Sequence, residues 1–294
     1  MITRFAPSPT GMLHLGHAYS AILAHDCAKA VNGRFLLRIE DIDRSRAREA
    51  WEAQIYEDLS WLGLSWERPV RRQSEHLETY REAIDRLWRE GLLYPCSCTR
   101  ADIAAALSAP QEGAMGPDGP VYPGICRPVK SAKRQGSAPD DVALRLDMKA
   151  ALSRIELISF EENGSGPDGE SGAIKVSAAE MRERVGDVVI ARKDMGTSYH
   201  LSVVIDDAAQ GITEVIRGRD LFPSTKIHVL LQGLLGLSSP TYRHHRLIRD
   251  DAGKRLAKRD DARAIALYRE RGASPQDIRR MVNLPENGVG AMSA

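Results

Sequence analysis

Several features that mark other classes of protein are absent from this sequence of 294 residues. Lys and Arg total 41 and Asp and Glu total 40, a formal net charge of +1, so global basicity gives no argument for nucleic-acid binding and any such surface must be local. The segment Met1–Gly11 lacks the apolar stretch of a secretory signal. No run approaches the roughly 18–20 apolar residues of a membrane span. These absences predict a cytoplasmic protein without a membrane role.

Cysteine is also scarce, with four residues in the chain. Three of them, Cys96, Cys98 and Cys126, lie in a polar segment, which fits metal ligation in a reducing compartment better than a disulfide framework. From the residues alone, a three-thiolate site completed by Asp102 or Asp118 and a site without metal are both open interpretations. Cys27 falls within a helical pattern and is expected to be a small buried side chain.

The length predicts about two structural units and a sizeable core. Ile2–Ala6 is expected to be a strand, 15–31 a helix with helical spacing of apolar residues, and Arg34–Ile39 a second strand. Strand, helix and strand within forty residues indicate a parallel βαβ unit. The fold class expected is therefore α/β, with a Rossmann-like doubly wound parallel sheet.

The remainder of the chain alternates between periodic and irregular segments. The expected elements are helices over 45–62 and 74–89, an irregular insertion over 108–141, an exposed loop over 163–172, a strand at Leu201–Ile205, a strand at 212–217 and a helix at 225–235. The last three return to the alternation of the first part, which favours a core built from two separated halves.

The loop from Ala6 to His17 contains two prolines and leads into the first helix. Free N–H groups at a helix start favour an anion, Gly11 and Gly16 permit close backbone approach, and His14 and His17 add donors. Phosphate binding is one interpretation. A capped turn carrying two surface histidines is the alternative.

Acidic residues follow the strand at Arg34–Ile39. Ligands of open α/β sheets bind beyond the carboxyl ends of the strands, so a carboxylate there is suited to an ammonium group. Asp43 is explained by capping the helix that follows, whereas Glu40 is not. Glu40 is thus the stronger candidate for binding.

A basic segment runs from Asp250 to Arg259 and is preceded by Arg243, His244, His245 and Arg246. It could clamp a polyphosphate or steer an acidic polymer, although a charge run is more often a solvated face.

Together these segments resemble a family. The motifs RFAPSPTGMLHLGH, RIEDID, RQS, YPCSCTR, VIDD, VIRGRD and GKRLAKRD occur in the order and spacing of the catalytic core of class I glutamyl-tRNA synthetases. HLGH at His14–His17 is similar to the HIGH signature, and RLAKR at Arg255–Arg259 occupies the KMSKS position. Arg255 replaces the first Lys and Ala257 the Ser, which leaves Lys258 as the expected ATP ligand.

The resemblance implies roles for individual residues. His14, His17 and Lys258 would serve catalysis, and with Gly16 they would bind ATP, which brings Mg²⁺. The implied glutamate site consists of Arg4, Ala6, Ser8, Glu40, Tyr199 and Arg217. The pattern CxC followed by YxxxC resembles a zinc site of this family, which implies one structural Zn²⁺ held by Cys96, Cys98, Tyr122 and Cys126.

Beyond the KMSKS position the sequence has only a short helical stretch over 262–284, too little for an anticodon-binding region. A core of this kind resembles the glutamyl-Q tRNA(Asp) synthetases, the paralogues that attach glutamate to queuosine at the wobble position of tRNA(Asp). This implies L-glutamate, ATP and a queuosine-carrying anticodon stem-loop as partners, a monomeric state, and RNA-backbone contacts from the basic stretch at 243–258. A truncated glutamyl-tRNA synthetase and a non-catalytic adenylate-binding or tRNA-binding module are the alternatives.

The expected division has four parts. Residues 1–94 form the first half of the Rossmann core, 95–194 an insertion with the zinc segment, 195–240 the second half of the core, and 241–294 the KMSKS-like loop with a short helical segment.

Overall fold

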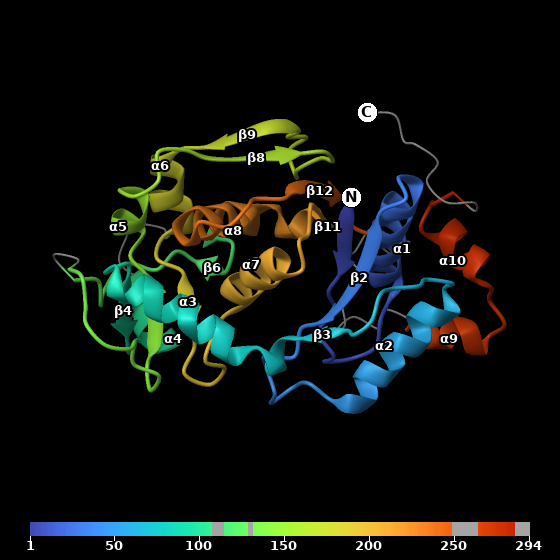
Figure 1. Ribbon diagram of the computed structural model, residues 1–294, viewed down its shortest axis with the longest axis horizontal. Coiled ribbons are helices and arrows are strands. Elements are labelled where there is room, and N and C mark those ends of the chain that lie inside the picture. Colours follow the sequence, from blue (N-terminus) through green and yellow to red (C-terminus); the bar gives the residue numbers. More distant parts are fainter. Residues whose placement is uncertain (108–114, 129–131, 249–263, 286–294) are drawn as a thin grey trace.

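The computed structural model describes residues 1–107, 115–128, 132–248 and 264–285 (Figure 1). The basic segment Asp250–Arg259, including Arg255, Ala257 and Lys258, lies outside the described residues. The predicted α/β fold is confirmed.

The first half of the parallel sheet is the predicted βαβ unit. Strand β1 (Ile2–Phe5) pairs in parallel with β2 (Arg34–Ile39), from Ile2 opposite Arg34 to Phe5 opposite Leu37. Helix α1 (Leu15–Ala30) connects them, and the short strand β3 (Arg71–Arg72) extends the sheet beyond β2. Helices α2 (Glu49–Trp61) and α3 (Leu77–Arg89) follow the predicted periodicity.

The second half repeats the pattern. Strand β11 (Glu214–Gly218) pairs in parallel with β12 (Thr241–His245), and helix α8 (Phe222–Leu235) connects them. A backbone hydrogen bond of 3.0 Å from the N–H of Thr213 to the oxygen of Ile2 places the start of β11 beside β1. The carboxyl ends of β1, β2 and β11 therefore meet at one edge.

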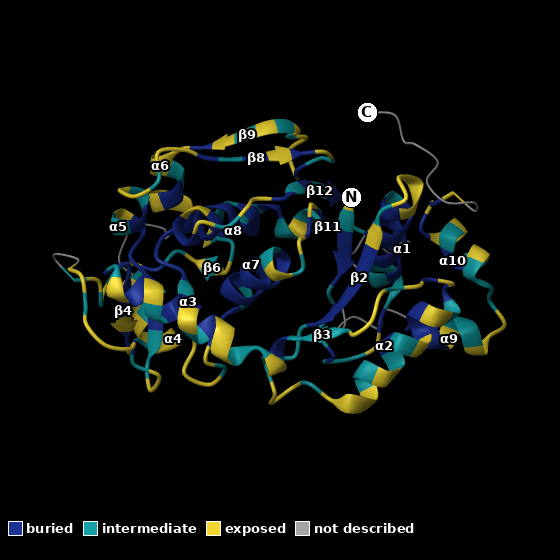
Figure 2. Ribbon diagram, viewed as in Figure 1, coloured by how far each residue is buried: buried dark blue, intermediate teal, exposed yellow. Residues whose placement is uncertain are grey.

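The prediction of a strand at Leu201–Ile205 is wrong, because these residues lie in helix α7 (Tyr199–Ala209). A five-residue apolar run does not distinguish a buried strand from a buried helix. Ser198 caps the helix by accepting from the N–H of Leu201, and every residue from His200 to Asp207 is buried. Figure 2 shows α7 and β2 as largely buried elements at the centre of the molecule.

The segment between the two halves builds its own antiparallel sheet. Strands β4 (Leu93–Cys96), β7 (Ala143–Leu146) and β10 (Val189–Ala191) pair in the order β10-β7-β4. Between them lie helices α4 (Arg100–Leu107), α5 (Met148–Leu152) and α6 (Ala178–Glu180), a π-turn at Met181–Val185 and a hairpin of β5 (Met115–Gly116) and β6 (Gly119–Pro120).

One hairpin of the expected insertion extends the core sheet instead. Strands β8 (Ile158–Glu162) and β9 (Gly172–Val176) are antiparallel to each other, and β8 runs parallel to β12, with Glu162 opposite Tyr242. The predicted loop over 163–172 is the connection between them, apart from Gly172, which begins β9. Part of 95–194 is thus continuous with the second half of the core.

After the gap at 249–263, helices α9 (Ile265–Glu270) and α10 (Pro275–Met281) form the predicted short helical segment. The N–H of Ile265 donates to the oxygen of Leu13 at 2.9 Å, and α10 packs on α1 (Figure 1). Among the helices that the structure describes, none combines the length and apolar character needed to cross a membrane.

A buried ion pair secures α10. Arg279 donates to both carboxylate oxygens of Asp26 on α1, at 2.7 and 3.1 Å, and both side chains are largely buried. We expect Arg279→Ala to lower the free energy of unfolding by about 2–3 kcal/mol, because it leaves a buried carboxylate with fewer donors. Urea unfolding at pH 7 measures this.

The matched control is Arg280→Ala, one residue along the same helix, where the arginine side chain is 61% exposed and pairs with Asp277. It should change stability much less. Equal effects of the two substitutions would contradict a specific role for the pair with Asp26.

Candidate active site

A cleft of about 1310 Å³ opens at the carboxyl edge of the parallel strands. Every described residue of the expected glutamate and ATP sites lines it: Arg4, Ala6, Ser8, His14, Gly16, His17, Glu40, Tyr199 and Arg217. Cys98 and Tyr122 of the expected zinc site line it as well. The cleft exceeds the roughly 300–1000 Å³ of an ordinary small-molecule pocket, so two small substrates can share it.

The two histidines of the HLGH segment lie at the start of α1. His14 is the N-cap, and its Nδ1 accepts from the N–H of Gly16 at 3.1 Å. The N–H of His14 donates to Nδ1 of His17 at 3.2 Å, and the ring centroids are 3.8 Å apart. These hydrogen bonds confirm that the histidines cap the turn, and both rings also line the cleft. Phosphate binding at this helix N-terminus stays a prediction.

Gly16 leaves room for the His14 ring. A Cβ atom at this position would lie 3.0 Å from Cε1 and 3.1 Å from Nδ1 of that ring. A larger residue would require the ring to shift by a few tenths of an ångström.

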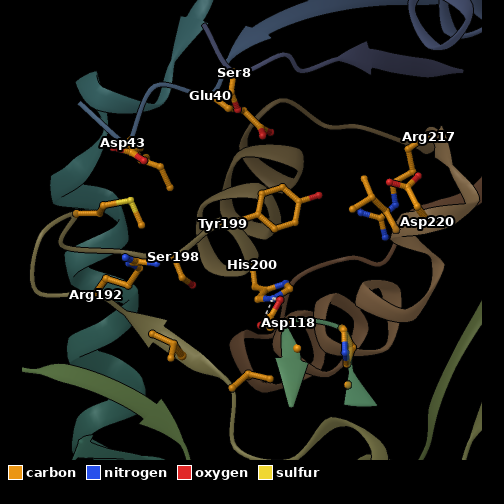
Figure 3. Close-up of a pocket in the computed structure, with 18 of the residues that line it drawn as sticks. Ser8, Glu40, Asp43, Asp118, Arg192, Ser198, Tyr199, His200, Arg217 and Asp220 are labelled. Carbon is orange, nitrogen blue, oxygen red and sulfur yellow. Dashed lines mark hydrogen bonds and ion pairs between the residues drawn. The ribbon is translucent and has the colours of Figure 1, made fainter. Parts of the chain in front are cut away.

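Two predicted glutamate-site residues belong to a buried charge cluster. Arg4 donates through Nε and Nη2 to the two carboxylate oxygens of Asp207, at 3.0 and 3.4 Å. Arg38, fully buried on β2, donates to Asp207 at 2.6 Å and to Glu40 at 3.2 Å. Burial raises the pKa of Glu40, and Arg38 and Arg4 partly offset this effect. Glu40 thus projects from an arginine-rich floor into the cleft (Figure 3).

The neighbouring carboxylate, Asp206, holds the first half of the fold against α7. It accepts hydrogen bonds from Nε of Arg71 at 2.7 Å, from the Gln73 amide at 2.8 Å and from the Tyr80 hydroxyl at 2.9 Å. These donors come from β3, the turn after it and α3.

Arg217, at the end of β11, is held by three acceptors. Its Nε donates to Nε2 of His244 at 3.1 Å, and its Nη2 donates to the Thr225 hydroxyl at 2.7 Å. Its Nη1 lies 3.2 Å from Nδ1 of His228. Because arginine only donates, both histidine nitrogens are acceptors.

His244 is fixed from its other side by Glu162 of β8. Glu162 accepts from the backbone N–H of His244 at 2.8 Å and from Nδ1 at 2.5 Å. Burial lowers the pKa of His244, and it also lowers that of His245, to about 4. These two histidines therefore add no positive charge to the basic segment that follows them, because buried imidazoles remain neutral.

The arginines on either side of them are also engaged within the chain. Arg243 donates to Glu214 at 3.1 Å, and Arg246 donates to the backbone oxygen of Val282 at 2.5 Å. Both arginines remain partly exposed, and the solvated-face interpretation of 250–259 falls outside the described residues.

Tyr199 begins α7 and projects into the cleft, with its hydroxyl directed toward the side that carries Arg217 (Figure 3). Its ring is 5.6 Å from that of His228. Asp43, also in the cleft, does not cap α2, which begins at Glu49; it accepts from Ser45 at 2.6 Å and from Arg46 at 2.5 Å.

The expected zinc ligands lie together. The sulfur atoms of Cys96, Cys98 and Cys126 are all within 4.8 Å of one another. The Tyr122 hydroxyl oxygen is 3.4 Å from Sγ of Cys96 and 3.3 Å from Sγ of Cys98. Around a tetrahedral zinc ion with bonds of about 2.3 Å to sulfur and 2.0–2.2 Å to oxygen, such ligands lie roughly 3.5 Å apart. Three thiols and a phenol at these spacings fit zinc.

The two alternative carboxylates are engaged elsewhere. Asp102 accepts from the N–H of Thr99 at 2.7 Å and from its hydroxyl at 2.8 Å. Asp118 lines the cleft, and one of its carboxylate oxygens is 2.9 Å from Nε2 of His200. The three-thiolate interpretation with an aspartate as the fourth ligand is therefore disfavoured.

Sequence reasoning missed the residues that support the site. Asp206 and Asp207 lie within the VIDD motif. The strand predicted at Leu201–Ile205 placed them just after its end, where no burial was expected. His200, His228 and Glu162 come from distant elements, and only the three-dimensional structure brings them to Arg217.

These features are those of a class I aminoacyl-tRNA synthetase catalytic domain. A family model described as tRNA synthetases class I (E and Q), catalytic domain, matches residues 1–288. The glutamate-tRNA synthetase of Elizabethkingia anophelis superimposes with a TM-score of 0.74 at 26% identity, over 96% of this chain and 61% of that one. A methionyl-tRNA synthetase of Mycobacterium tuberculosis shares the fold, with a TM-score of 0.56 at 11% identity. The chain spans about three fifths of the length of these solved synthetases.

Relatives of similar length identify the particular family within this class. A glutamyl-Q tRNA(Asp) synthetase of Rhodobacter capsulatus is 61% identical over 97% of this chain and 100% of its own length. One from Symbiobacterium thermophilum is 41% identical over 94% of this chain and 83% of its own. The chain belongs to the glutamyl-Q tRNA(Asp) synthetase family, and it is a ligase of the class I aminoacyl-tRNA synthetase type.

The ionisation of Asp207 makes the free energy of unfolding depend on pH in the acidic range. Burial opposes its ionisation, but Arg4 and Arg38 outweigh burial and hold the pKa of Asp207 below its usual 3.8. A lowered folded pKa contributes stability above about pH 3.8 that is lost as the pH falls further. We expect Asp207→Asn to lower the free energy of unfolding at pH 7 by about 3–5 kcal/mol.

The same substitution should flatten the fall in stability between pH 5 and pH 3, measured by urea unfolding. Asp194→Asn is the control, because the pKa of Asp194 is also lowered while its side chain is 65% exposed. An unchanged acid profile in Asp207→Asn would show that other carboxylates control it.

Proposed function

We propose that this protein activates L-glutamate with ATP and transfers the glutamyl group to the cyclopentenediol of queuosine at the wobble position of tRNA(Asp). The observation that carries the proposal is the 61% identity with a glutamyl-Q tRNA(Asp) synthetase over 97% of this chain and 100% of that protein. It is combined with one cleft that gathers the described residues of the expected amino-acid and ATP sites.

The amino-acid site would use opposite charges for the two kinds of group in glutamate. Glu40 offers a carboxylate for the ammonium, and Arg217 and Arg4 offer guanidinium N–H groups for carboxylates. Ser8, Tyr199 and the backbone of Ala6 would add hydrogen bonds. Arginine donors facing the substrate's carboxylate would disfavour glutamine, whose amide NH₂ also donates.

Activation needs positioning and charge stabilisation more than a protein base. An oxygen of the α-carboxylate attacks the α-phosphorus of ATP, the mixed anhydride forms, and pyrophosphate leaves with its Mg²⁺. His14, His17 and the helix N-terminus at Gly16 would face the phosphates. Lys258, the remaining proposed ATP ligand, lies outside the described residues.

In the second step, a hydroxyl oxygen of the cyclopentenediol attacks the adenylate carbonyl, the ester forms, AMP leaves and the hydroxyl proton is released. The anticodon stem-loop must then reach the cleft. Contacts to the RNA backbone would come from the basic stretch at 243–258, of which residues 249–258 lie outside the described residues.

Two assays test the function. Without tRNA, we expect glutamate-dependent exchange of labelled pyrophosphate into ATP. With queuosine-containing tRNA(Asp), labelled glutamate should appear on the anticodon loop, and tRNA(Asp) with guanosine at the wobble position should remain unlabelled.

Label at the terminal adenosine of tRNA(Glu) would instead identify a truncated synthetase that charges 3′ ends. Absence of exchange under every condition would indicate the non-catalytic module.

We further propose that Cys96, Cys98, Tyr122 and Cys126 hold one structural Zn²⁺ per chain. The spacing of the three sulfur atoms and the phenol oxygen supports this set. The backbone N–H of Cys126 donates to the Tyr122 oxygen at 2.9 Å, which suits a phenolate ligand. Bound zinc would join β4 to the segment after β6.

Metal analysis of purified protein should give about one zinc per chain in the wild type. Cys98→Ser should lose it, because a hydroxyl is a poor replacement for a thiolate ligand. Tyr122→Phe should release zinc to a chelator faster than the wild type.

Cys27→Ser is the matched control, since Cys27 lies on α1 away from the cluster, and it should keep the metal. Retention of zinc by Cys98→Ser, or its loss in Asp118→Ala, would contradict the proposed ligand set.

A further inference from the structure

A row of hydrogen-bonded side chains runs from the β5–β6 hairpin to Arg217. Asp118, in the turn of that hairpin, lies with its carboxylate oxygens 2.9 and 3.0 Å from Nε2 of His200 (Figure 3). Nδ1 of His200 is 3.1 Å from Nε2 of His228, and Nδ1 of His228 is 3.2 Å from Nη1 of Arg217. The two histidines are buried, whereas the Asp118 side chain is 55% exposed.

The two ends of the row determine where its protons lie. Arginine can only donate, so Nδ1 of His228 accepts and its Nε2 carries the proton. That proton is donated to Nδ1 of His200, which leaves the His200 proton on Nε2, facing Asp118. An ionised carboxylate only accepts, so each hydrogen bond in the row has one donor and one acceptor.

The charge states agree with this pattern. Burial and the nearby Arg217 lower the pKa of His228 well below its usual 6.5, which keeps the ring neutral. The hydrogen bond from His200 outweighs partial burial and lowers the pKa of Asp118, which keeps the carboxylate ionised.

The contacts of Arg217 leave a defined pair of donors. Of its five N–H groups, one donates to His244, one to His228 and one to Thr225. One N–H therefore stays on each terminal nitrogen, and the side chain lines the cleft. A carboxylate accepts such a pair with both of its oxygens through two parallel hydrogen bonds, whereas an amide presents one acceptor oxygen and an NH₂ that donates.

We propose that Asp118, His200 and His228 are positioning residues that orient the guanidinium of Arg217, so that the β5–β6 hairpin sets the preference for glutamate over glutamine. The inference rests on the proposed function, because it assigns Arg217 to a substrate carboxylate. Asp118 acts at a distance here, through two imidazoles, and does not itself touch the amino acid.

The test uses glutamate-dependent pyrophosphate exchange without tRNA, with Asp118→Ala as the main variant. Loss of one charged acceptor should raise the KM for glutamate about 5- to 10-fold. The maximal exchange rate and the KM for ATP should stay within about two-fold, and the glutamate-to-glutamine ratio of kcat/KM should fall by a similar 5- to 10-fold. Asp118→Asn, which keeps an acceptor oxygen for His200, should restore most of the preference.

Asp140→Ala is the matched control, an exposed carboxylate in the same part of the chain. His228→Asn adds a second test, because its amide oxygen can still accept from Arg217 while the link to His200 is cut. In that background, Asp118→Ala should have no further effect on the KM for glutamate.

The outcomes separate the two proposals. If wild-type protein shows no exchange with glutamate, the proposed function fails. If it does, and Asp118→Ala keeps the wild-type KM and selectivity, the positioning role is overturned. An equal loss of ATP and glutamate affinity would also overturn it, because that pattern indicates a general structural defect.

Discussion

The buried guanidinium of Arg38 is the constraint on which the site depends. A charge without access to water must be paired, and its partners here are Asp207 and, at 3.7 Å, Asp206, both on α7, together with Glu40 at the end of its own strand. The first βαβ unit and the second half of the core are therefore joined by charge as well as by apolar packing. Because Arg4 shares Asp207, the floor of the cleft is fixed by the same cluster.

Local sequence patterns predicted the parts of this fold that local physics determines. The strand predicted at Arg34–Ile39 is β2, and the helix expected over 15–31 is α1, because apolar spacing and the Asn32-Gly33 stop act over a few residues. The position of Glu40 beyond the carboxyl end of a strand also followed from the sequence, since ligands of open α/β sheets bind there. Tyr199, and Tyr122 as the fourth metal ligand, required the family resemblance.

What could not be predicted depends on contacts between distant residues. The run Leu201–Ile205 is apolar except for Ser202, so its period does not separate a strand from a helix. In the structure this segment is buried as a helix that packs on α8 and α3. The residues that support Arg217 also come from distant parts of the sequence. Glu162 is 82 residues from its partner His244, and Asp118 is 82 residues from its partner His200. The neutrality of His244 and His245 likewise reflects burial that no charge count reveals.

Helix α7 carries functional groups at both ends. Tyr199 and His200 face the cleft at its start, and Asp206 and Asp207 hold the arginine cluster at its end. Each added residue rotates the later part of a helix by about 100° relative to the earlier part. A single insertion or deletion within 201–205 would thus rotate Asp206 and Asp207 away from the arginines while Tyr199 and His200 still faced the cleft. Exchanges among the apolar residues of this segment would leave both ends in place. The geometry of the site therefore constrains the length of this helix more than its apolar composition.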